Sequence, residues 1–360
     1  MIWFFIVPVL FYFLLVGYIY IHIRPAEPVT KDASGPVKIS VIVPCRNEEN
    51  YIPAILANLR DQDYDPAHFE VIVVDDNSSD GTFDRASTFR GIRNYKILHN
   101  TARGKKSAIA LGISNSEGEL IITTDADCRL GQKWISSFAA KYEGKKPDLI
   151  IGPVRLDEKR GFFGRFGELE FLSLQGITIG SALAGKPVMC NGANLCITRE
   201  AWLKHSVNIR PEIPSGDDIF LLQSLKKDPE ALIEWLDSPE GMVTTRQEES
   251  VIRFIRQRAR WISKSGRYKD ALALTLASVT FAAILSVILL IAGSIADNGF
   301  LPVLVVALLI KSVPDYLLLK KMTEMYRRKD LLKWFLPSQL VYPFYVLITA
   351  LVSPFTTRTW

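Results

Sequence analysis

Apolar residues gather at both ends of the chain and leave a more polar middle. The first 23 residues contain no Asp, Glu, Lys or Arg. A helix crosses the ~30 Å hydrocarbon core of a bilayer in about 20 residues, so residues 1–23 predict a membrane-spanning helix. This stretch is longer than a signal-peptide core and has no basic start, so we expect a retained anchor rather than a cleaved leader.

Further apolar stretches lie toward the other end of the sequence, at residues 271–296, 300–319 and 332–352. The first of them is uncharged throughout and is the clearest span. The second has a lysine, a proline and an aspartate inside it, and the third has a lysine and two prolines. These interruptions leave two interpretations of the last two stretches: spans that kink or pack against other helices, or a re-entrant or interfacial hairpin.

Basic residues mark one side of this arrangement. They follow the first apolar stretch, precede the second and fill the link between the third and the fourth, whereas the link between the second and the third has none. If there are four spans, the positive-inside rule places residues from about 37 to 268 in the cytosol and both termini outside. We therefore expect an integral protein of the cytoplasmic membrane with a cytosolic central domain.

The central region alternates short apolar runs with segments of helical period. The runs predict buried strands at residues 38–43, 71–74, 95–98 and 120–122, with helices at 48–60 and 105–114. Alternating strands and helices are typical of an α/β domain with a mostly parallel sheet, whose ligands bind beyond the carboxyl ends of the strands. Arg46, Asp76 and the pair Asp125 and Asp127 follow those ends, so we expect them to meet at one edge of the sheet.

Two common phosphate-binding loops are excluded. No G-x-G-x-x-G follows the first predicted strand, and the GKKS sequence at 104–107 lacks the upstream glycine of a P-loop because position 99 is His99. A metal ion held on carboxylates is another way to bind phosphate. Asp125 and Asp127, one residue apart after a strand, suit Mg²⁺ or Mn²⁺, although such a pair also occurs in solvated turns.

Composition narrows the class of protein. With 48% hydrophobic and 22% charged residues and a mean hydropathy of +0.15, the chain is not disordered. The net charge of +5 comes from basic residues that adjoin apolar stretches rather than an aromatic platform, so we expect no nucleic-acid partner. The 4 cysteines form no Cys-x-x-Cys pair and are expected to be unpaired thiols.

Ordered motifs run through residues 38–262. They are VPCRNEE at 43–49, VDDNSSDGT at 74–82, RGK at 103–105, DAD at 125–127, GAN at 192–194, GDD at 216–218 and QRARW at 257–261. In this order and between apolar stretches, they resemble the membrane-integrated inverting glycosyltransferases of family 2, and are similar to those of polysaccharide synthases and ceramide glucosyltransferases.

This resemblance implies a GT-A fold, a Rossmann-like α/β domain that binds nucleotide sugars, with one N-terminal and about three C-terminal membrane helices. The expected parts are an anchor (1–23), a linker (24–36), a catalytic domain (37–246), an amphipathic interfacial helix with the Gln-x-x-Arg-Trp motif (247–269) and the C-terminal membrane helices (270–360).

The resemblance also implies roles for the donor side of the site. Asp76 would contact the uracil ring, with Pro44 and Glu48 lining the nucleoside pocket and Arg46 beside them. Lys105 would help to hold the base or the diphosphate, unless it is an ordinary charge at the start of a helix. Asp125 and Asp127 would hold the metal ion on the diphosphate, Asp127 more directly.

On the acceptor side, Asp218 resembles the general base that removes the proton of the acceptor hydroxyl. Asp217 stands where the family usually has Glu, and we place it at the acceptor and diphosphate site. Gln257, Arg260 and Trp261 fall on one helical face and would line that site too, with Trp261 stacking on the acceptor.

Two helical segments have a second interpretation. The stretch around 251–262 is also typical of a basic amphipathic helix at a membrane surface, and both roles can hold together. Residues 161–174 are a further interfacial candidate, for which the alternative is a buried core helix.

The predicted function is transfer of a sugar from a nucleotide donor, expected to be UDP-linked, to a lipid or lipid-linked acceptor at the cytosolic membrane face. A processive polysaccharide synthase is the main alternative, and the few predicted spans favour the lipid acceptor. An inactive nucleotide-sugar-binding membrane scaffold is the other alternative. The sequence leaves any protein partner open.

Overall fold

A computed structural model of the protein describes residues 2–24, 37–208 and 216–356. Most of the predicted linker 24–36 lies outside the described residues. The described chain divides into two compact units: a helical unit from 2–24, 158–189 and 247–356, and a sheet unit from 37–157, 190–208 and 216–246. This division differs from the predicted domain 37–246 at residues 158–189, because that segment packs with the apolar helices.

The sheet unit is built on a seven-stranded sheet of order β3-β2-β1-β4-β7-β5-β8. Its strands are β1 (Ile39–Cys45), β2 (Phe69–Asp75), β3 (Tyr95–His99), β4 (Leu120–Thr123), β5 (Leu149–Ile151), β7 (Leu195–Thr198) and β8 (Ile233–Trp235). The four predicted strands pair in parallel, whereas β7 runs antiparallel to both β4 and β5. The sheet is therefore mixed rather than wholly parallel, and a separate parallel pair joins β6 (Val154–Leu156) to β9 (Val243–Thr245).

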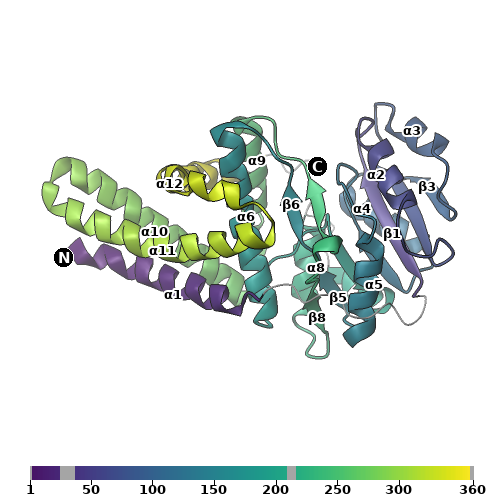
Figure 1. Ribbon diagram of the computed structural model, residues 1–360, viewed down its shortest axis with the longest axis horizontal. Coiled ribbons are helices and arrows are strands. Elements are labelled where there is room, and N and C mark those ends of the chain that lie inside the picture. Colours follow the sequence, from purple (N-terminus) through teal and green to yellow (C-terminus); the bar gives the residue numbers. More distant parts are fainter. Residues whose placement is uncertain (1, 25–36, 209–215, 357–360) are drawn as a thin grey trace. The chain divides into compact units, whose positions relative to one another are not determined.

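Six helices accompany the sheet (Figure 1). They are α2 (Ile52–Arg60), α3 (Thr82–Thr88), α4 (Lys105–Ser114), α5 (Trp134–Lys145), α7 (Arg199–His205) and α8 (Asp217–Leu225). All seven residues of β1 are buried, and the core continues from this strand into the apolar faces of α2 and α5. The apolar runs form strands because both faces of a central parallel strand are covered.

The helical unit contains α1 (Ile6–His22), α6 (Gly161–Leu183), α9 (Val251–Ile262), α10 (Ala271–Ala296), α11 (Leu301–Met325) and α12 (Phe335–Val352). Most of α6 is buried, and it packs against α1 and α11. Of the two interpretations of residues 161–174, the buried helix is therefore the one that the structure supports.

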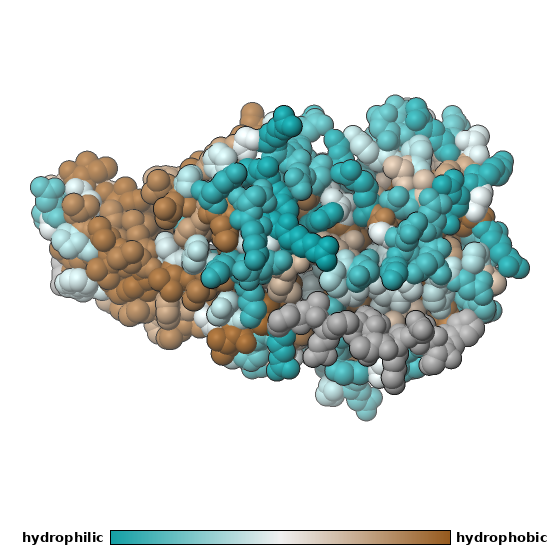
Figure 2. Space-filling view, in the orientation of Figure 1, coloured by the Kyte–Doolittle hydropathy of each residue, from teal (hydrophilic) through white to brown (hydrophobic). Residues whose placement is uncertain are grey.

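Four helical segments of the described chain are long and apolar enough to cross a membrane: Ile2–His22, Ala271–Ala296, Asn298–Met325 and Lys329–Phe355. The last two correspond to the stretches that also allowed a hairpin. Figure 2 shows an apolar surface over α1, α10 and α11, to which exposed Leu14 and Leu309 contribute. Such an extended apolar surface is typical of contact with lipid rather than water. The cytosolic orientation stays a prediction.

A buried polar cluster joins three of these helices. The Lys311 ammonium, in a side chain only 1% exposed, donates to the Asp315 carboxylate at 2.6 Å and to the amide oxygen of Gln339 at 2.8 Å. The Tyr12 hydroxyl donates to the other Asp315 oxygen at 2.5 Å. Charges inside an apolar span are costly unless they pair, so the polar interruption of α11 is matched by partners from α1 and α12.

Replacing Lys311 by methionine should destabilise the helical unit, because it leaves the Asp315 carboxylate buried without its cation. Breaking a buried ion pair in this way costs about 3–5 kcal/mol, so we expect a clearly lower melting temperature in detergent. Lys320→Met, at an exposed position of the same helix, is the matched control. The double variant K311M/D315L should recover part of the loss, and a K311M melting temperature equal to the control would contradict the role of the pair.

Candidate active site

The polar residues predicted to meet at one sheet edge do so. Parallel register places Cys45 opposite Asp75, and Asp75 opposite His99, so β1, β2 and β3 end level with one another. Arg46 and Asp76 directly follow the first two strands, and Asp125 follows β4 after one further residue. The topology therefore gathers side chains that are up to 80 residues apart in sequence.

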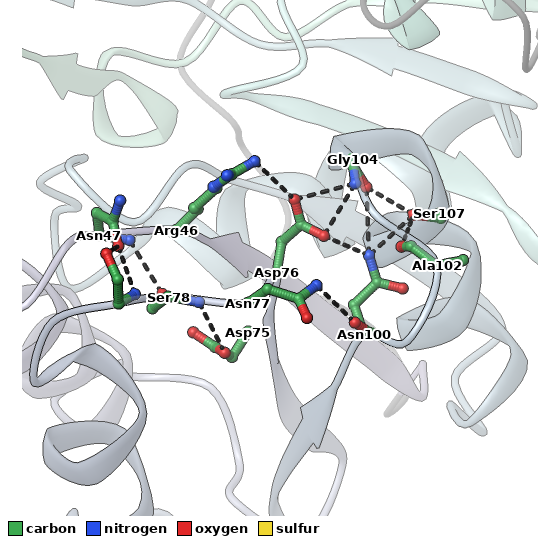
Figure 3. Close-up of polar contacts among 11 residues, drawn as sticks. Arg46, Asn47, Asp75, Asp76, Asn77, Ser78, Asn100, Ala102, Gly104 and Ser107 are labelled. Carbon is green, nitrogen blue, oxygen red and sulfur yellow. Dashed lines mark hydrogen bonds and ion pairs between the residues drawn. The ribbon is translucent and has the colours of Figure 1, made fainter. Parts of the chain in front are cut away.

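Asp76 is fully buried, and its carboxylate has two hydrogen-bond donors and one ion-pair partner. The backbone N–H of Gly104 donates to both oxygens at 2.9 and 3.0 Å, and the Asn100 amide donates at 2.6 Å. Arg46 lies 3.7 Å away on the other side (Figure 3). Gly104 immediately precedes α4 and has φ +111°, a backbone conformation that residues with side chains rarely adopt. Asp76 thus fixes the start of α4.

The loops after β1 and β2 bind to each other through their polar side chains. The Asn47 amide oxygen accepts from the Ser79 backbone at 2.8 Å, and the Ser78 hydroxyl accepts from the Asn47 backbone at 3.0 Å. Asn47 and Asn77 both have positive φ, which Asn tolerates better than most residues. Much of the VDDNSSDGT motif therefore holds these two loops in place (Figure 3).

Lys105, the first residue of α4, is surrounded by carboxylates. Its ammonium forms an ion pair with Asp125. Burial lowers the pKa of Lys105, but the charges of Asp125 and Asp217 outweigh burial, so its pKa lies above the ordinary value. Asp218 acts in the same direction. Lys105 is therefore a fixed cation between the end of β4 and the start of α8.

Asp217 and Asp218 begin α8 directly after Gly216, whose φ is +83°. Asp218 accepts hydrogen bonds from the backbone of Gly192 at 3.1 Å and of Ile219 at 2.8 Å. A helix N-terminus carries a partial positive charge, which favours acidic side chains at these two positions. Burial raises the pKa of Asp217, and the neighbouring Asp218 raises it further.

Asp127 and Glu48 add to the negative charge at this edge. Burial raises the pKa of Asp127, and Asp125 raises it further. Burial, Asp127 and Asp125 together raise the pKa of Glu48 to about 7, against the opposing charge of Arg246. The carboxylates here exceed what the nearby cations balance, so Asp127 and Glu48 resist ionisation.

This donor set fits a divalent cation of the Mg²⁺ type. No group of three or more His, Cys, Asp or Glu in the described part of the chain is arranged as a complete metal site. Asp125 and Asp127 are instead a pair, and Mg²⁺ is commonly held by one or two carboxylates together with substrate phosphates. A cation there would relieve the repulsion that raises the pKa of Asp127.

The remaining predicted residues are Pro44 in the sheet unit and the Gln-x-x-Arg-Trp residues in the helical unit. Pro44 is buried within β1 opposite Val74. Gln257, Arg260 and Trp261 lie on α9 of the helical unit and are half-buried. The structure thus brings together the donor-side residues and the Asp217–Asp218 pair within the sheet unit, while the Gln-x-x-Arg-Trp set belongs to the other unit.

Sequence reasoning missed several residues of this edge. Asn100, which holds Asp76, follows β3 directly, so the rule that located Asp76 applies to it as well. Thr245 donates to Asp127 at 3.3 Å, and the Arg246 guanidinium lies 4.1 Å from the centre of the Tyr51 ring. Thr245 is the last residue of β9 and Arg246 follows it, and this three-residue strand is too short to show an apolar period in the sequence.

Comparisons with known proteins agree with this arrangement. Residues 40–206 match the family model Glycosyl transferase family 2. Poly(ribitol-phosphate) beta-N-acetylglucosaminyltransferase TarS of Staphylococcus aureus is 32% identical over 127 residues, 35% of this chain and 22% of the relative. Dodecaprenyl-phosphate galacturonate synthase of Rhizobium johnstonii is 31% identical over 147 residues, 39% of this chain and 43% of the relative. The chain thus spans less than half of these curated relatives.

One solved structure matches almost the whole chain. It is the mannosyltransferase PcManGT from Pyrobaculum calidifontis in complex with GDP-Man and Mn²⁺, with a TM-score of 0.60 and 18% identity over 98% of this chain and 99% of that one. The predicted α/β GT-A fold with helices at both ends is confirmed.

Replacing Asp76 by asparagine should loosen the start of α4. The amide introduced at position 76 would replace one acceptor oxygen by an NH₂ group, which would face the Gly104 N–H or the Asn100 amide. A buried donor that loses its acceptor in this way costs about 1–3 kcal/mol. We expect a lower melting temperature and weaker binding of UDP and GDP by calorimetry, because Lys105 is displaced. Asp84→Asn, at an exposed position of α3, should match the unsubstituted protein. An unchanged melting temperature for D76N would argue against this bonding.

Proposed function

We propose that this protein is a membrane-bound inverting glycosyltransferase that transfers a sugar from a nucleotide donor to a lipid or lipid-linked acceptor. The observation that carries the proposal is the group of carboxylates around Lys105: Asp125 in an ion pair with it, and Asp217 and Asp218 close enough to raise its pKa. A nucleotide sugar offers the negative diphosphate and the electrophilic carbon that such a set can use.

The reaction proposed is a single displacement. The acceptor hydroxyl attacks the anomeric carbon, its proton passes to the Asp218 carboxylate, and the bond from that carbon to the diphosphate oxygen breaks. The nucleoside diphosphate leaves with the bonding electrons, and the anomeric configuration inverts. Lys105 would neutralise part of the charge that develops on the leaving group. The hydrogen bonds from Gly192 and Ile219 hold Asp218 in position for this role.

A divalent cation, Mg²⁺ or Mn²⁺, is part of this proposal. When bound, it would supply positive charge to the diphosphate, with Asp125 and Asp127 as its protein ligands. Asp76, Arg46, Glu48 and Pro44 would lie on the nucleoside side. Both Asp76 oxygens already have partners within the protein. A nucleobase that contacts Asp76 would therefore compete with Arg46, the most distant of these partners.

Two observations favour a lipid acceptor. Four helices of the described chain can span a membrane, and α9, which carries Gln257, Arg260 and Trp261, has exposed Val251 and Ile252 suited to a bilayer surface. The similar Rhizobium johnstonii enzyme is named for a dodecaprenyl phosphate product, and a relative of Aeromonas hydrophila, 36% identical over 93 residues, for undecaprenyl phosphate. We place the reaction at the cytosolic face.

A glycan acceptor is the second candidate, because the similar Staphylococcus aureus enzyme is named for a poly(ribitol-phosphate) acceptor. Labelled UDP- and GDP-sugars offered to the detergent-purified protein, with undecaprenyl phosphate, ceramide or oligosaccharide acceptors, would separate the candidates. One added sugar on a lipid supports the proposal, whereas a ladder of products supports a synthase. The GDP-sugars test the expected preference for UDP.

Asp218→Asn should remove the base and leave the donor site intact. General base catalysis contributes about 10²–10⁴-fold, so we expect kcat to fall by about a thousandfold. Binding of the nucleoside diphosphate, measured by calorimetry, should stay within about twofold of the unsubstituted protein, because Lys105 and the Asp125–Asp127 pair are unchanged. Full turnover in D218N would remove the assignment of the base, and Asp84→Asn serves as the control.

Chelation should abolish transfer if the carboxylate pair acts through a metal ion. We expect EDTA to stop the reaction and added Mg²⁺ or Mn²⁺ to restore it, because the diphosphate then regains its counter-charge. Asp127→Asn should raise the metal concentration needed for half-maximal rate by about tenfold. Rates that are unchanged in EDTA would refute the metal requirement while leaving the base assignment standing.

A further inference from the structure

Arg258, inside the Gln-x-x-Arg-Trp motif but not one of its named residues, is buried in the helical unit with 4% of its side chain exposed. It grips Glu170 of α6 with two nitrogens: Nη2 lies 2.7 Å from Oε2, and Nε lies 3.0 and 3.1 Å from the two oxygens. Burial lowers the pKa of Arg258, but Glu170 outweighs burial and raises it. The contact through two nitrogens fixes the orientation of the guanidinium.

Glu170 is held in turn by a candidate membrane span. The Tyr345 hydroxyl of α12 donates to Glu170 Oε1 at 3.0 Å. The Tyr345 ring packs against Phe166 of α6 and Phe254 of α9, with ring centres 5.3 and 5.4 Å apart. This aromatic contact and the carboxylate therefore join α6, α9 and α12 around Arg258.

The other side of Arg258 contacts two residues assigned to the acceptor site. Its guanidinium carbon lies 4.2 Å from the centre of the Trp261 ring, a cation–π distance, and Nη1 donates to the Gln257 amide oxygen. The Gln257 amide nitrogen donates to Glu248 at 3.0 Å. Gln257 is therefore held at both ends of its amide, and the Trp261 indole lies against a fixed planar cation.

We propose that Arg258 is the positioning residue of this motif, and that Glu170 and Tyr345 set its orientation. The inference rests on the proposed acceptor role of Gln257 and Trp261. An ordinary structural ion pair would need only a charge at position 258. Stacking on Trp261 while donating to Gln257 and Glu170 needs the planar, multidentate guanidinium, which lysine lacks.

Arg258→Lys separates a plain ion-pair role from a positioning role. It keeps the positive charge opposite Glu170 but loses the planar guanidinium group. The reporter is Trp261 fluorescence, obtained as the difference between each protein and the same protein carrying Trp261→Phe. We expect acrylamide quenching of Trp261 to rise at least twofold in R258K. With undecaprenyl phosphate as acceptor, KM for the acceptor should rise about tenfold while KM for the nucleotide sugar stays unchanged.

Tyr345→Phe is a second variant that keeps the aromatic packing and removes only the hydroxyl. We expect both Trp261 quenching and the KM for the acceptor to rise, by less than in R258K. Tyr326→Phe is its matched control, since that hydroxyl donates to Gln175 of the same helix α6 at 3.1 Å and does not touch Glu170. Its Trp261 quenching and kinetics should equal those of the unsubstituted protein.

The outcomes distinguish this proposal from the proposed function. Trp261 quenching in R258K equal to that of the unsubstituted protein would overturn the positioning role, whatever the kinetics. A rise in quenching with an equal rise in both KM values would also overturn it, because the effect would not be confined to the acceptor. The unsubstituted protein could transfer sugar to none of the acceptors while R258K still raises Trp261 quenching. In that case the proposed function fails and the positioning of Trp261 by Arg258 stands.

Discussion

The arrangement of the sheet unit depends on keeping many carboxylates at one edge with few cations to balance them. Each negative group has a different means of support. Asp76 accepts hydrogen bonds from backbone and amide N–H groups, and Asp125 forms an ion pair with the Lys105 ammonium. Asp218 lies at the N-terminus of α8 and accepts a backbone hydrogen bond from Gly192. Asp127 and Glu48 are left with raised pKa values, and this excess of acceptors suits the divalent cation of the proposed function.

The sequence was enough to predict this edge because its signals are local. Apolar runs marked the four parallel strands, and parallel connections require that the carboxyl ends of such strands lie together. The antiparallel insertion of β7 between β4 and β5 could not be predicted, since pairing with residues 44–78 positions away leaves no periodic trace. Asn194 shows the same limit: its side chain bonds Trp134, Pro153 and Gly241, a buried structural role that its motif did not reveal.

The sequence left two interpretations of residues 161–174 open for a related reason. These residues begin helix α6, which carries Glu168 and Glu170. Both are buried because their partners arrive from distant positions, Arg328 and Arg258. Amphipathicity is read from the helix itself, whereas the partner that makes a buried charge tolerable is a property of the folded chain.

The cluster at Lys311 constrains how the protein is made. Helix α11 is synthesised before Gln339 of α12 exists, so the lysine has only Asp315, one turn away on its own helix, and Tyr12 of the first helix nearby when it first meets the bilayer. Its last acceptor arrives only with the following helix. Completion of this membrane bundle is therefore a late event in biosynthesis, and a chain truncated before α12 would carry an incompletely paired ammonium group into the lipid.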